Sequence, residues 1–438
     1  MLRFPSRVLT VGGRVAMVRS AAHAPLPHAS RPAAGRETAQ LHLFSKATDV
    51  ELFAGAGGLA LGLAAAGIAA AHLYERNARA CVTLTTNKAA GHGKRLGDIN
   101  EVDVREVDWT ALPRPARLLA AGPPCQPFSL AGSHAGNEDP RNEFPATLRA
   151  VRQLQPAVVL LENVHGLTRE SFRPYLDYIL RQLAFPSIAP ASDDEKWTDH
   201  AARLALHARG VPEEEQEYAV RCGVLNAADY GVPQQRMRVV MIATKRGYPV
   251  VELPAPTHSR DALIHAQATG AYWEGHGIVR PDDYKVPKRG PAQAEDPEHR
   301  LLPWRTVREA LAGMGEPSDK EEGSNHHWLV PGARLYRGHQ GSVMDWPSKT
   351  IKAGVHGVAG GENIVHLDDG SFRYFTLREM ARVQGFPDDY VFHGPRSRII
   401  GQIGNAVPCG LAEALGRPLM KMFRKFPELS DRPRMAAN

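Results

Sequence analysis

Cysteine is scarce in this sequence. Its four cysteines are spread along the chain, and none belongs to the closely spaced pairs that zinc sites use. A chain of 438 residues does not need disulfides for stability, so each cysteine is first interpreted as a small buried residue. The sequence therefore gives no reason to expect a metal site or a disulfide framework. The cysteines are Cys81, Cys125, Cys222 and Cys409.

Long hydrophobic runs are also lacking, with one exception. Residues 52–74 carry no charged side chain and are numerous enough to cross a bilayer. However, Gly55, Gly57 and Gly58 would break a helix near its start. We interpret this stretch as a strand, a glycine loop, a helix and a second strand, and we expect a cytoplasmic protein.

An excess of one charge is lacking over most of the chain. The formal net charge is +6 and the sequence pI is about 9.1. Residues 1–47 contain seven basic residues and one acidic residue, so residues 48–438 are balanced. The basic pI is therefore no argument for nucleic-acid binding by the body of the protein. We interpret residues 1–47 as a disordered basic tail, while a transit peptide or a later start at Met17 stay open.

Strand and helix signals alternate from residue 48 onward. Alternation of this kind predicts an α/β fold, Rossmann-like and doubly wound, with a parallel sheet covered on both faces. Strands are predicted at residues 50–53, 68–74, 117–121, 157–161, 218–225 and 239–243, with a further strand ending at residues 98–99. Helices are predicted at residues 59–66, 77–87 and 142–154.

The alternation stops and later resumes, which predicts more than one domain. Residues 48–245 form the predicted catalytic and cofactor-binding domain, with a polar, solvated insertion at 185–217. Residues 246–375 are rich in Pro, Gly, His and charge, which predicts a smaller domain without long helices. Residues 376–438 begin with a predicted helix at 376–383 and return to the regular pattern.

A glycine loop at residues 51–59 (Glu-Leu-Phe-Ala-Gly-Ala-Gly-Gly-Leu) separates a predicted strand from a predicted helix. Backbone N–H groups converge at such a helix start and can hold a ligand, although a loop of this kind alone can also be a tight turn. Glycines at 55, 57, 58 and 62 do not have the dinucleotide-binding spacing. Glu75 and Asp98 end the next two predicted strands, where carboxylates hold ribose or adenine groups. Together these residues predict a nucleoside-bearing ligand without a diphosphate.

Three further motifs carry chemically reactive groups. Cys125 lies in Pro-Pro-Cys-Gln after a predicted strand, a loop position that suits a nucleophilic thiolate. Glu162 directly follows an apolar strand and can donate a proton, although a helix cap is the alternative. Arg236 and Arg238 alternate at strand spacing and can clamp an anion or a base carbonyl, or else form an edge-strand charge pair.

These motifs, with Gly-Asn-Ala-Val-Pro at residues 404–408, follow the order found in a known family. Over about residues 48–245 and 373–416 the chain resembles the DNA (cytosine-5) methyltransferases. The resemblance implies S-adenosylmethionine as cofactor, duplex DNA as substrate and a target-recognition domain at 246–375. It also implies a bacterial or phage modification enzyme, monomeric, with a cognate restriction endonuclease acting independently.

The resemblance also implies individual roles. Cys125 adds to C6 of a cytosine flipped from the duplex, and Glu162 protonates or hydrogen-bonds N3. Arg238 holds O2, and Arg236 supports the loop. The implied cofactor contacts are Phe53, Ala54, Gly55, Gly57, Gly58, Glu75, Arg76, Asp98, Ile99, Pro124, Asn405 and Ala406. The expected DNA contacts are Gln126, Ser129 and the basic cluster Lys285, Lys288 and Arg289.

Two residues depart from the family pattern. Glu51 stands where Asp is more common, and Arg76 stands where some members have an aromatic residue. Adenine could then stack on a guanidinium face, or not stack. Other hypotheses are an RNA (tRNA) cytosine-5 methyltransferase and a catalytically idle DNA-binding homologue. A nicotinamide-dependent oxidoreductase is disfavoured by the glycine spacing.

Overall fold

The computed structural model covers most of the chain after the N-terminal tail. It describes residues 48–92, 95–112, 115–124, 142–192, 194–282, 284, 301–320, 326–335, 337, 340–354, 363–426 and 429. The prediction of a disordered tail at residues 1–47 lies outside the described residues.

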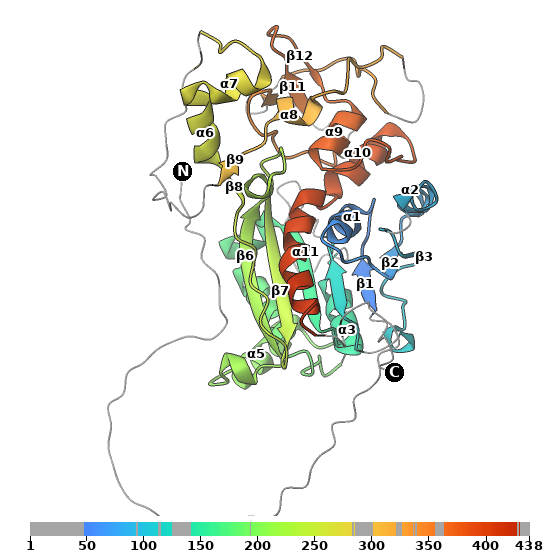
Figure 1. Cartoon of the computed structure of the whole chain (residues 1–438). Helices are drawn as coiled ribbons and strands as arrows, with labels where there is room; N and C mark the ends of the chain where they lie inside the picture. The colour runs from blue at the N-terminus through green and yellow to red at the C-terminus, as the bar shows by residue number, and fades with distance from the viewer. Residues whose placement is uncertain are drawn as a thin grey trace, which may run out of the picture.

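A seven-stranded sheet forms the centre of the larger part of the molecule, in the order β3-β2-β1-β4-β5-β7-β6 (Figure 1). The first five strands are mutually parallel. The sheet winds outward in both directions from β1 and β4, so the predicted doubly wound class is confirmed. The strands are β1 (Asp49–Leu52), β2 (His72–Glu75), β3 (Asp98–Glu101), β4 (Leu118–Ala121), β5 (Val158–Val164), β6 (Tyr218–Asn226) and β7 (Met237–Lys245).

The sheet departs from the predicted parallel arrangement at one edge. Strand β7 runs antiparallel to both β5 and β6. Residues 227–236 join β6 to β7 and include only a short 3-10 helix, η8 (Ala227–Tyr230). A parallel pair needs a crossover of a dozen or more residues, so this short connection forces the antiparallel pairing.

The opposite edge also differs from the prediction, because β3 begins at Asp98 rather than ending there. The strand is mostly polar, and two of its four residues are exposed, so it has no apolar pattern that would mark its limits. A Cβ on Gly97 would lie 2.1 Å from the carbonyl oxygen of Ala70, so the chain enters β3 through a position that needs glycine.

Helices cover both faces of the sheet. Helices α1 (Gly58–Ala65) and α11 (Cys409–Phe423) pack on one face, and α3 (Phe144–Leu154) and α4 (Arg173–Ala184) pack on the other. Neighbouring strand residues divide between these cores: Leu160 faces α1 and α11, and Leu161 faces α3 and α4. Helix α2 (Ala78–Ala89) connects β2 to β3.

The polar insertion predicted at 185–217 contains a helix with a buried side. Helix α5 (Trp197–His207) packs on α4, where the Trp197 ring meets the Tyr175 ring edge-on at 5.4 Å between centroids. His200 is buried, and its Nδ1 lies 2.8 Å from the Tyr178 hydroxyl. The segment is therefore attached to the fold by an aromatic cluster as well as exposed to solvent.

The smaller part of the molecule lies above the sheet in Figure 1. Its longest described helix between residues 246 and 375 has ten residues, in line with the prediction of short helices. The predicted helix at 376–383 is confirmed as α9, which begins with a capping box between Thr376 and Glu379. The helices are α6 (Arg260–Thr269), α7 (Ala271–His276), α8 (Val307–Leu311), α9 (Leu377–Val383) and α10 (Arg396–Asn405). The strands are β8 (His258–Ser259), β9 (Leu302–Pro303), β10 (Ser342–Val343), β11 (Ile364–His366) and β12 (Phe372–Tyr374).

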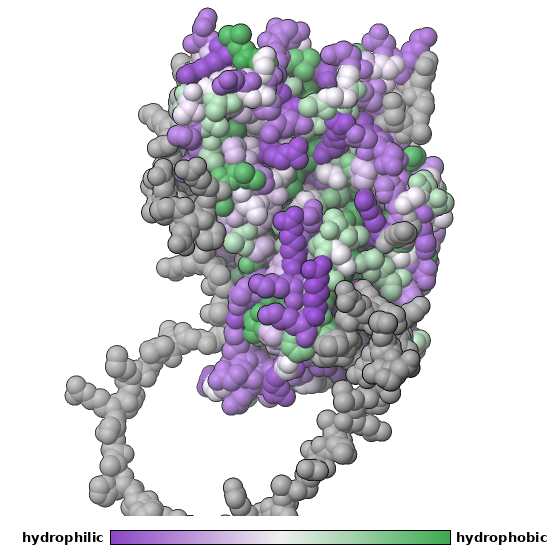
Figure 2. Space-filling model, viewed as in Figure 1, coloured by the Kyte–Doolittle hydropathy of each residue, from purple (hydrophilic) through white to green (hydrophobic). Residues whose placement is uncertain are grey.

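Residues 52–74 include the end of β1, the glycine loop, α1 and most of β2, in the predicted order, although β2 begins at residue 72 rather than 68. Within the described part of the chain, each helix is too short or too polar to span a membrane. Figure 2 shows a largely hydrophilic face on which the hydrophobic areas are small and separate.

Candidate active site

The two principal motifs meet where the sheet changes its winding direction. Strands β1 and β4 are hydrogen-bonded neighbours, and connections lead away from this pair to opposite sides. In open α/β sheets, ligands bind at this switch point, outside the carboxyl ends of the strands. The glycine loop follows β1, and Gly122, Pro123 and Pro124 follow β4, so both lie at this position.

The glycine loop has an unusual backbone. Phe53, Gly55 and Gly57 all have positive φ angles, of 57°, 53° and 87°. Such a φ is strained for Phe53, and this kind of strain is concentrated at functional sites. Glycine is needed at position 57 for two reasons. Its φ is positive, and a Cβ there would lie 2.8 Å from the Leu84 side chain. Ala54, between Phe53 and Gly55, is buried and accepts a hydrogen bond from the Gly57 amide at 2.8 Å.

Not every glycine of this region belongs to the loop. A Cβ on Gly58 would lie 2.4 Å from the Val407 carbonyl oxygen, and one on Gly62 would lie 2.2 Å from that of Cys409. Both glycines therefore permit α1 to approach the start of α11. Gly62 serves helix packing, and only the earlier glycines shape the loop.

Glu75, at the carboxyl end of β2, fastens the glycine loop. Its two carboxylate oxygens accept hydrogen bonds from the amides of Gly55, at 2.8 Å, and Asn77, at 2.7 Å. Each carboxylate oxygen can accept a second bond, so the group can also bind a hydroxyl. Glu75 therefore lies beside the loop, as its position at the end of a predicted strand indicated.

Asp98 does not lie at the same end of the sheet as Glu75. Asp98 is level with His72 at the start of the strands, whereas Glu101 is level with Glu75. The Asp98 side chain is 74% exposed and pairs with Lys88 at 3.0 Å, which lowers the pKa of Asp98. Its predicted place near the end of the third strand is therefore corrected. Ile99 is half-buried and level with Leu73.

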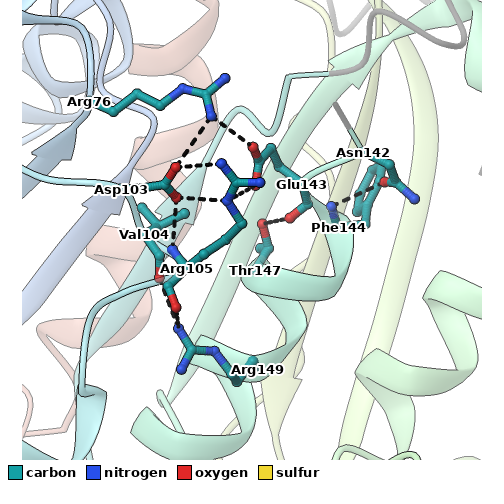
Figure 3. Close-up of polar contacts among 9 residues, drawn as sticks. All are labelled: Arg76, Asp103, Val104, Arg105, Asn142, Glu143, Phe144, Thr147 and Arg149. Carbon is teal, nitrogen blue, oxygen red and sulfur yellow. Dashed lines mark hydrogen bonds and ion pairs between the residues drawn. The ribbon is translucent and has the colours of Figure 1, made fainter. Parts of the chain in front are cut away.

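Arg76 lies directly beyond Glu75 and is held by two carboxylates (Figure 3). Its Nη1 is 3.4 Å from Asp103 Oδ2 and 3.4 Å from Glu143 Oε1. The side chain is half exposed, so one side of the guanidinium stays accessible. Arg76 therefore takes up a fixed position at the edge of the site.

Glu162 and Arg238 form a buried ion pair at the carboxyl end of β5. Arg238 Nε lies 2.7 Å from Glu162 Oε1. Burial lowers the pKa of Arg238, and the Glu162 carboxylate opposes this effect. A Cβ on Gly122 would lie 3.6 Å from Glu162 Oε2, so the carboxylate is next to the chain that leads to Cys125. Pro124 is half-buried, and Cys125, Gln126 and Ser129 lie outside the described residues.

Arg236 and Arg238 have different partners, and among the described residues the Arg236 side chain binds only backbone carbonyl oxygens. It is 2% exposed and donates to the carbonyl oxygens of Ile351, Gly404 and Ala406, at 3.0, 2.7 and 3.1 Å. The Arg236 side chain therefore fixes the backbone behind the site. Strand spacing placed both arginines on one side, but only packing determined their different partners.

Residues distant in sequence complete the site. Gly404 packs against residue Ala353, because a Cβ there would lie 2.4 Å from the Ala353 amide nitrogen. Asn405 ends α10 and is exposed, and Ala406 follows it with its Cβ close to Gly58. The C-terminal segment therefore closes one side of the glycine loop.

Several supporting residues were not singled out from the sequence. Gln384 Nε2 donates to the Ile403 carbonyl oxygen at 2.6 Å, and its Oε1 accepts from Gln234 at 2.8 Å. Asn163 Nδ2 donates to the Pro123 carbonyl oxygen at 3.1 Å. Asn163 directly follows Glu162, and Gln234 lies two residues before Arg236, so both are adjacent to residues singled out from the sequence. The pairing with Gln384 depends on the tertiary structure.

Cys81, Cys222 and Cys409 are buried free thiols, as the first interpretation of the cysteines predicted. Burial raises the pKa of each to about 12, so none is a thiolate near neutral pH. The proposed DNA contacts Lys285, Lys288 and Arg289 lie outside the described residues.

Known proteins are similar to this chain in sequence and in fold. The chain is 30% identical to the Type II methyltransferase M.PspPI of Psychrobacter sp. (strain TA137), over 86% of this chain and 80% of that protein. It is 29% identical to the Type II methyltransferase M.Eco47II of Escherichia coli, with the same coverage. A mutant of Spodoptera frugiperda DNMT2 has the same fold, with a TM-score of 0.52 and 16% identity over 86% of this chain and 100% of that one.

The family model for C-5 cytosine-specific DNA methylase matches residues 47–185 and 212–421. The unmatched residues between these ranges contain α5 and fall within the predicted insertion. The match covers most of the chain and includes the glycine loop, Glu162, Arg238 and the segment around Asn405. The chain therefore belongs to the C-5 cytosine-specific DNA methylase family.

Proposed function

We propose that this protein is a DNA (cytosine-5-)-methyltransferase that uses S-adenosylmethionine and flips its target cytosine out of the duplex. The observation that carries the proposal is the buried Glu162–Arg238 pair beside Gly122. Gly122 lies three residues before Cys125 in the sequence, and the pair lies beside it at the switch point of the sheet. A carboxyl group and a guanidinium next to a thiol suit the N3, O2 and C6 positions of one cytosine ring.

The glycine loop fits the methionine end of S-adenosylmethionine. Gly55 and Gly57 turn the backbone through positive φ angles, and no diphosphate-binding glycine spacing is present. Phe53, Ala54 and Gly58 are the other proposed cofactor contacts of this loop. Bound there, S-adenosylmethionine supplies an electrophilic methyl group.

Further cofactor contacts are proposed on both β2 and β3, with Glu75 at the end of β2 and Asp98 at the start of β3. Glu75 binds the ribose hydroxyls with its free lone pairs, and Arg76 offers a guanidinium face to the adenine. Asp98 and Ile99 stay the predicted adenine contacts. Asp98 would have to exchange its Lys88 partner for the adenine amino group. Pro124, Asn405 and Ala406 would close the pocket.

The chain's own groups would then carry the chemistry. The Cys125 thiolate forms a bond to C6 of cytosine, while Glu162 hydrogen-bonds N3 and Arg238 holds O2. Electron density would thereby move to C5, which would take the methyl group from the sulfonium and leave S-adenosylhomocysteine. Removal of the C5 proton by a base then restores the ring's double bond and releases the Cys125 thiolate. Arg236 keeps this side of the site in place through its three backbone carbonyls.

Duplex recognition is proposed for residues 246–375, between the catalytic residues 48–245 and the C-terminal residues 376–438. Lys285, Lys288 and Arg289 would contact phosphates, and Gln126 and Ser129 would lie near the flipped base. We further propose a monomeric, cytoplasmic protein that protects DNA from an independently acting restriction endonuclease. This setting is supported by the names of its Type II methyltransferase relatives.

The test is bisulfite sequencing of DNA from a methylation-free host that expresses the chain. We expect 5-methylcytosine at one short sequence, and none with Cys125→Ala. Cys125→Ala should still bind S-adenosylmethionine in calorimetry, which controls for folding.

Full methylation by Cys125→Ala would refute the covalent mechanism. Transfer of labelled methyl groups to tRNA but not to DNA would favour the RNA hypothesis. Tight DNA binding without transfer to any methyl-free DNA would favour an idle homologue.

A further inference from the structure

Glu143 is a buried carboxylate at the start of α3, which is the first helix after residues 125–141. Its side chain is 3% exposed, and its Oε1 lies 3.4 Å from Arg76 Nη1. Its Oε2 lies 4.0 Å from Arg105 Nε and has no hydrogen-bond partner among the described residues. A buried carboxylate of this kind needs nearby positive charge, because it has lost its hydration.

The two arginines also share Asp103, so four charges of alternating sign form one cluster (Figure 3). Arg105 Nε donates to Asp103 Oδ1 at 2.9 Å, and Arg76 lies 3.4 Å from Asp103 Oδ2. Arg76 follows β2, Asp103 and Arg105 follow β3, and Glu143 starts α3. The cluster therefore joins three elements at the carboxyl edge of the sheet.

The chain on both sides of residues 125–141 is held by specific contacts. Before this segment, the Pro123 carbonyl oxygen accepts a hydrogen bond from Asn163 at 3.1 Å. After it, Asn142 Nδ2 lies 2.6 Å from the Tyr175 hydroxyl of α4. Glu143 is the next residue, and its side chain pairs with Arg76. Of these contacts, only that of Glu143 involves a residue next to Glu75, because its partner is Arg76.

Simple mechanical support of α3 would not require a buried charge. The Glu143 carbonyl oxygen already accepts from Thr147 at 2.9 Å within the helix. The side chain reaches instead to Arg76, the residue next to Glu75. A ligand that contacts Glu75 or Arg76 is therefore linked to the start of α3 through the Arg76–Glu143 ion pair.

We infer that Glu143 is a positioning residue that links the Glu75–Arg76 edge of the cofactor pocket to the start of α3. In this way it fixes the end of the segment that carries Cys125. The inference rests on the proposed function, since it assigns the cofactor to that edge. Binding of cofactor then stabilises the first turn of α3, and Glu143 is the connection.

Hydrogen exchange tests this link without any methyl transfer. S-adenosylhomocysteine, the product form without the methyl group, is added to the full chain, and exchange of peptides covering residues 142–154 is measured by mass spectrometry. We expect about tenfold slower exchange at the start of α3 in the wild type on binding. Glu143→Gln should bind the compound but lose this protection.

Activity provides the second readout. Glu143→Gln should lower kcat on DNA about tenfold, which corresponds to about 1.4 kcal/mol, while the Kd for S-adenosylmethionine rises less than threefold. Arg76→Gln should produce a similar loss of kcat. The double variant should be no slower than Arg76→Gln alone, because Arg76→Gln already breaks the Arg76–Glu143 contact.

Arg149→Gln is the matched control, as it lies on the same helix. Arg149 donates to the carbonyl oxygens of Val104 and Arg105 (Figure 3). It also donates to the carbonyl oxygen of Val107. Its loss should lower the Tm but retain the protection by S-adenosylhomocysteine and a kcat within twofold of wild type.

Unchanged protection in Glu143→Gln would overturn the inference, as would an equal loss in Arg149→Gln or additive losses in the double variant. Failure of the wild type to methylate DNA would refute the proposed function instead, so the two failures are distinguishable.

Discussion

Glu51, in β1 beneath the glycine loop, provides a sharp test of the energetics of the site. Its side chain is 1% exposed, and among the described residues neither carboxylate oxygen has a hydrogen-bond partner. Burial raises the pKa of Glu51 to about 8. The nearby buried groups Tyr390 and Cys409 have pKa values raised by burial, so they stay neutral while Glu51 titrates.

The direction of the pH effect follows from these values. The pKa of Glu51 in the folded state lies above the ordinary 4.5, so the folded state binds the proton more tightly than the unfolded state. Stability is therefore fully present below pH 4.5 and is lost progressively as the pH rises to about 8. At about 1.36 kcal/mol per pH unit, the loss amounts to about 5 kcal/mol.

Glu51→Gln keeps the shape of the side chain and removes its titration. We expect its Tm to be close to that of the wild type at pH 5 and clearly higher at pH 8.5. The measurement is differential scanning calorimetry of both proteins at pH 5, 6, 7, 8 and 8.5 without ligand. The difference in Tm should grow with each step until about pH 8.

A matched control is Glu106→Gln, because Glu106 is an exposed glutamate of the same domain. Its Tm should follow that of the wild type at every pH. A difference between Glu51→Gln and wild type that does not change with pH would refute the reasoning, and so would a difference that shrinks as the pH rises.

Other changes test other parts of the structure. Glu162→Gln should lower kcat by about 10²–10⁴-fold in single-turnover methyl transfer, since it removes the proposed N3 partner, and near-normal kcat would contradict this role. Arg236→Lys should lower the free energy of unfolding in urea by about 1–3 kcal/mol, because one ammonium cannot serve three carbonyls, and an unchanged midpoint would be inconsistent with this account. Gly62→Ala should destabilise by about 1–3 kcal/mol, because its Cβ would meet the Cys409 carbonyl oxygen. Gly275→Ala, in open space within α7, should instead be neutral or stabilising, and equal Tm losses in the two glycine variants would argue against the packing explanation.

Local patterns predicted the buried elements well and the exposed ones poorly. Residues 157–161 form an unbroken apolar run, and the structure has β5 there, extended to Val164. Strand β3 is polar and lies at the edge of the sheet, so its start at Asp98 was interpreted as its end. Burial produces the hydrophobic pattern from which a strand is predicted, and an edge strand has little of it.

The sequence alone determined the family and the order of the reactive groups. Glycine spacing, Pro-Pro-Cys, Glu162 and Arg238 are short-range patterns, and the resemblance rests on their order along the chain. It also determined the alternation of elements, because short apolar strands and amphipathic helices are encoded locally.

Only the tertiary structure decided which of these groups face one another. Arg236 and Arg238 are two residues apart, yet one binds backbone carbonyls and the other binds Glu162. Glu143 was not distinctive in sequence, and its role follows from the approach of Arg76, 67 residues earlier. Contacts between distant residues depend on how whole layers pack, and that information is not contained in any local pattern.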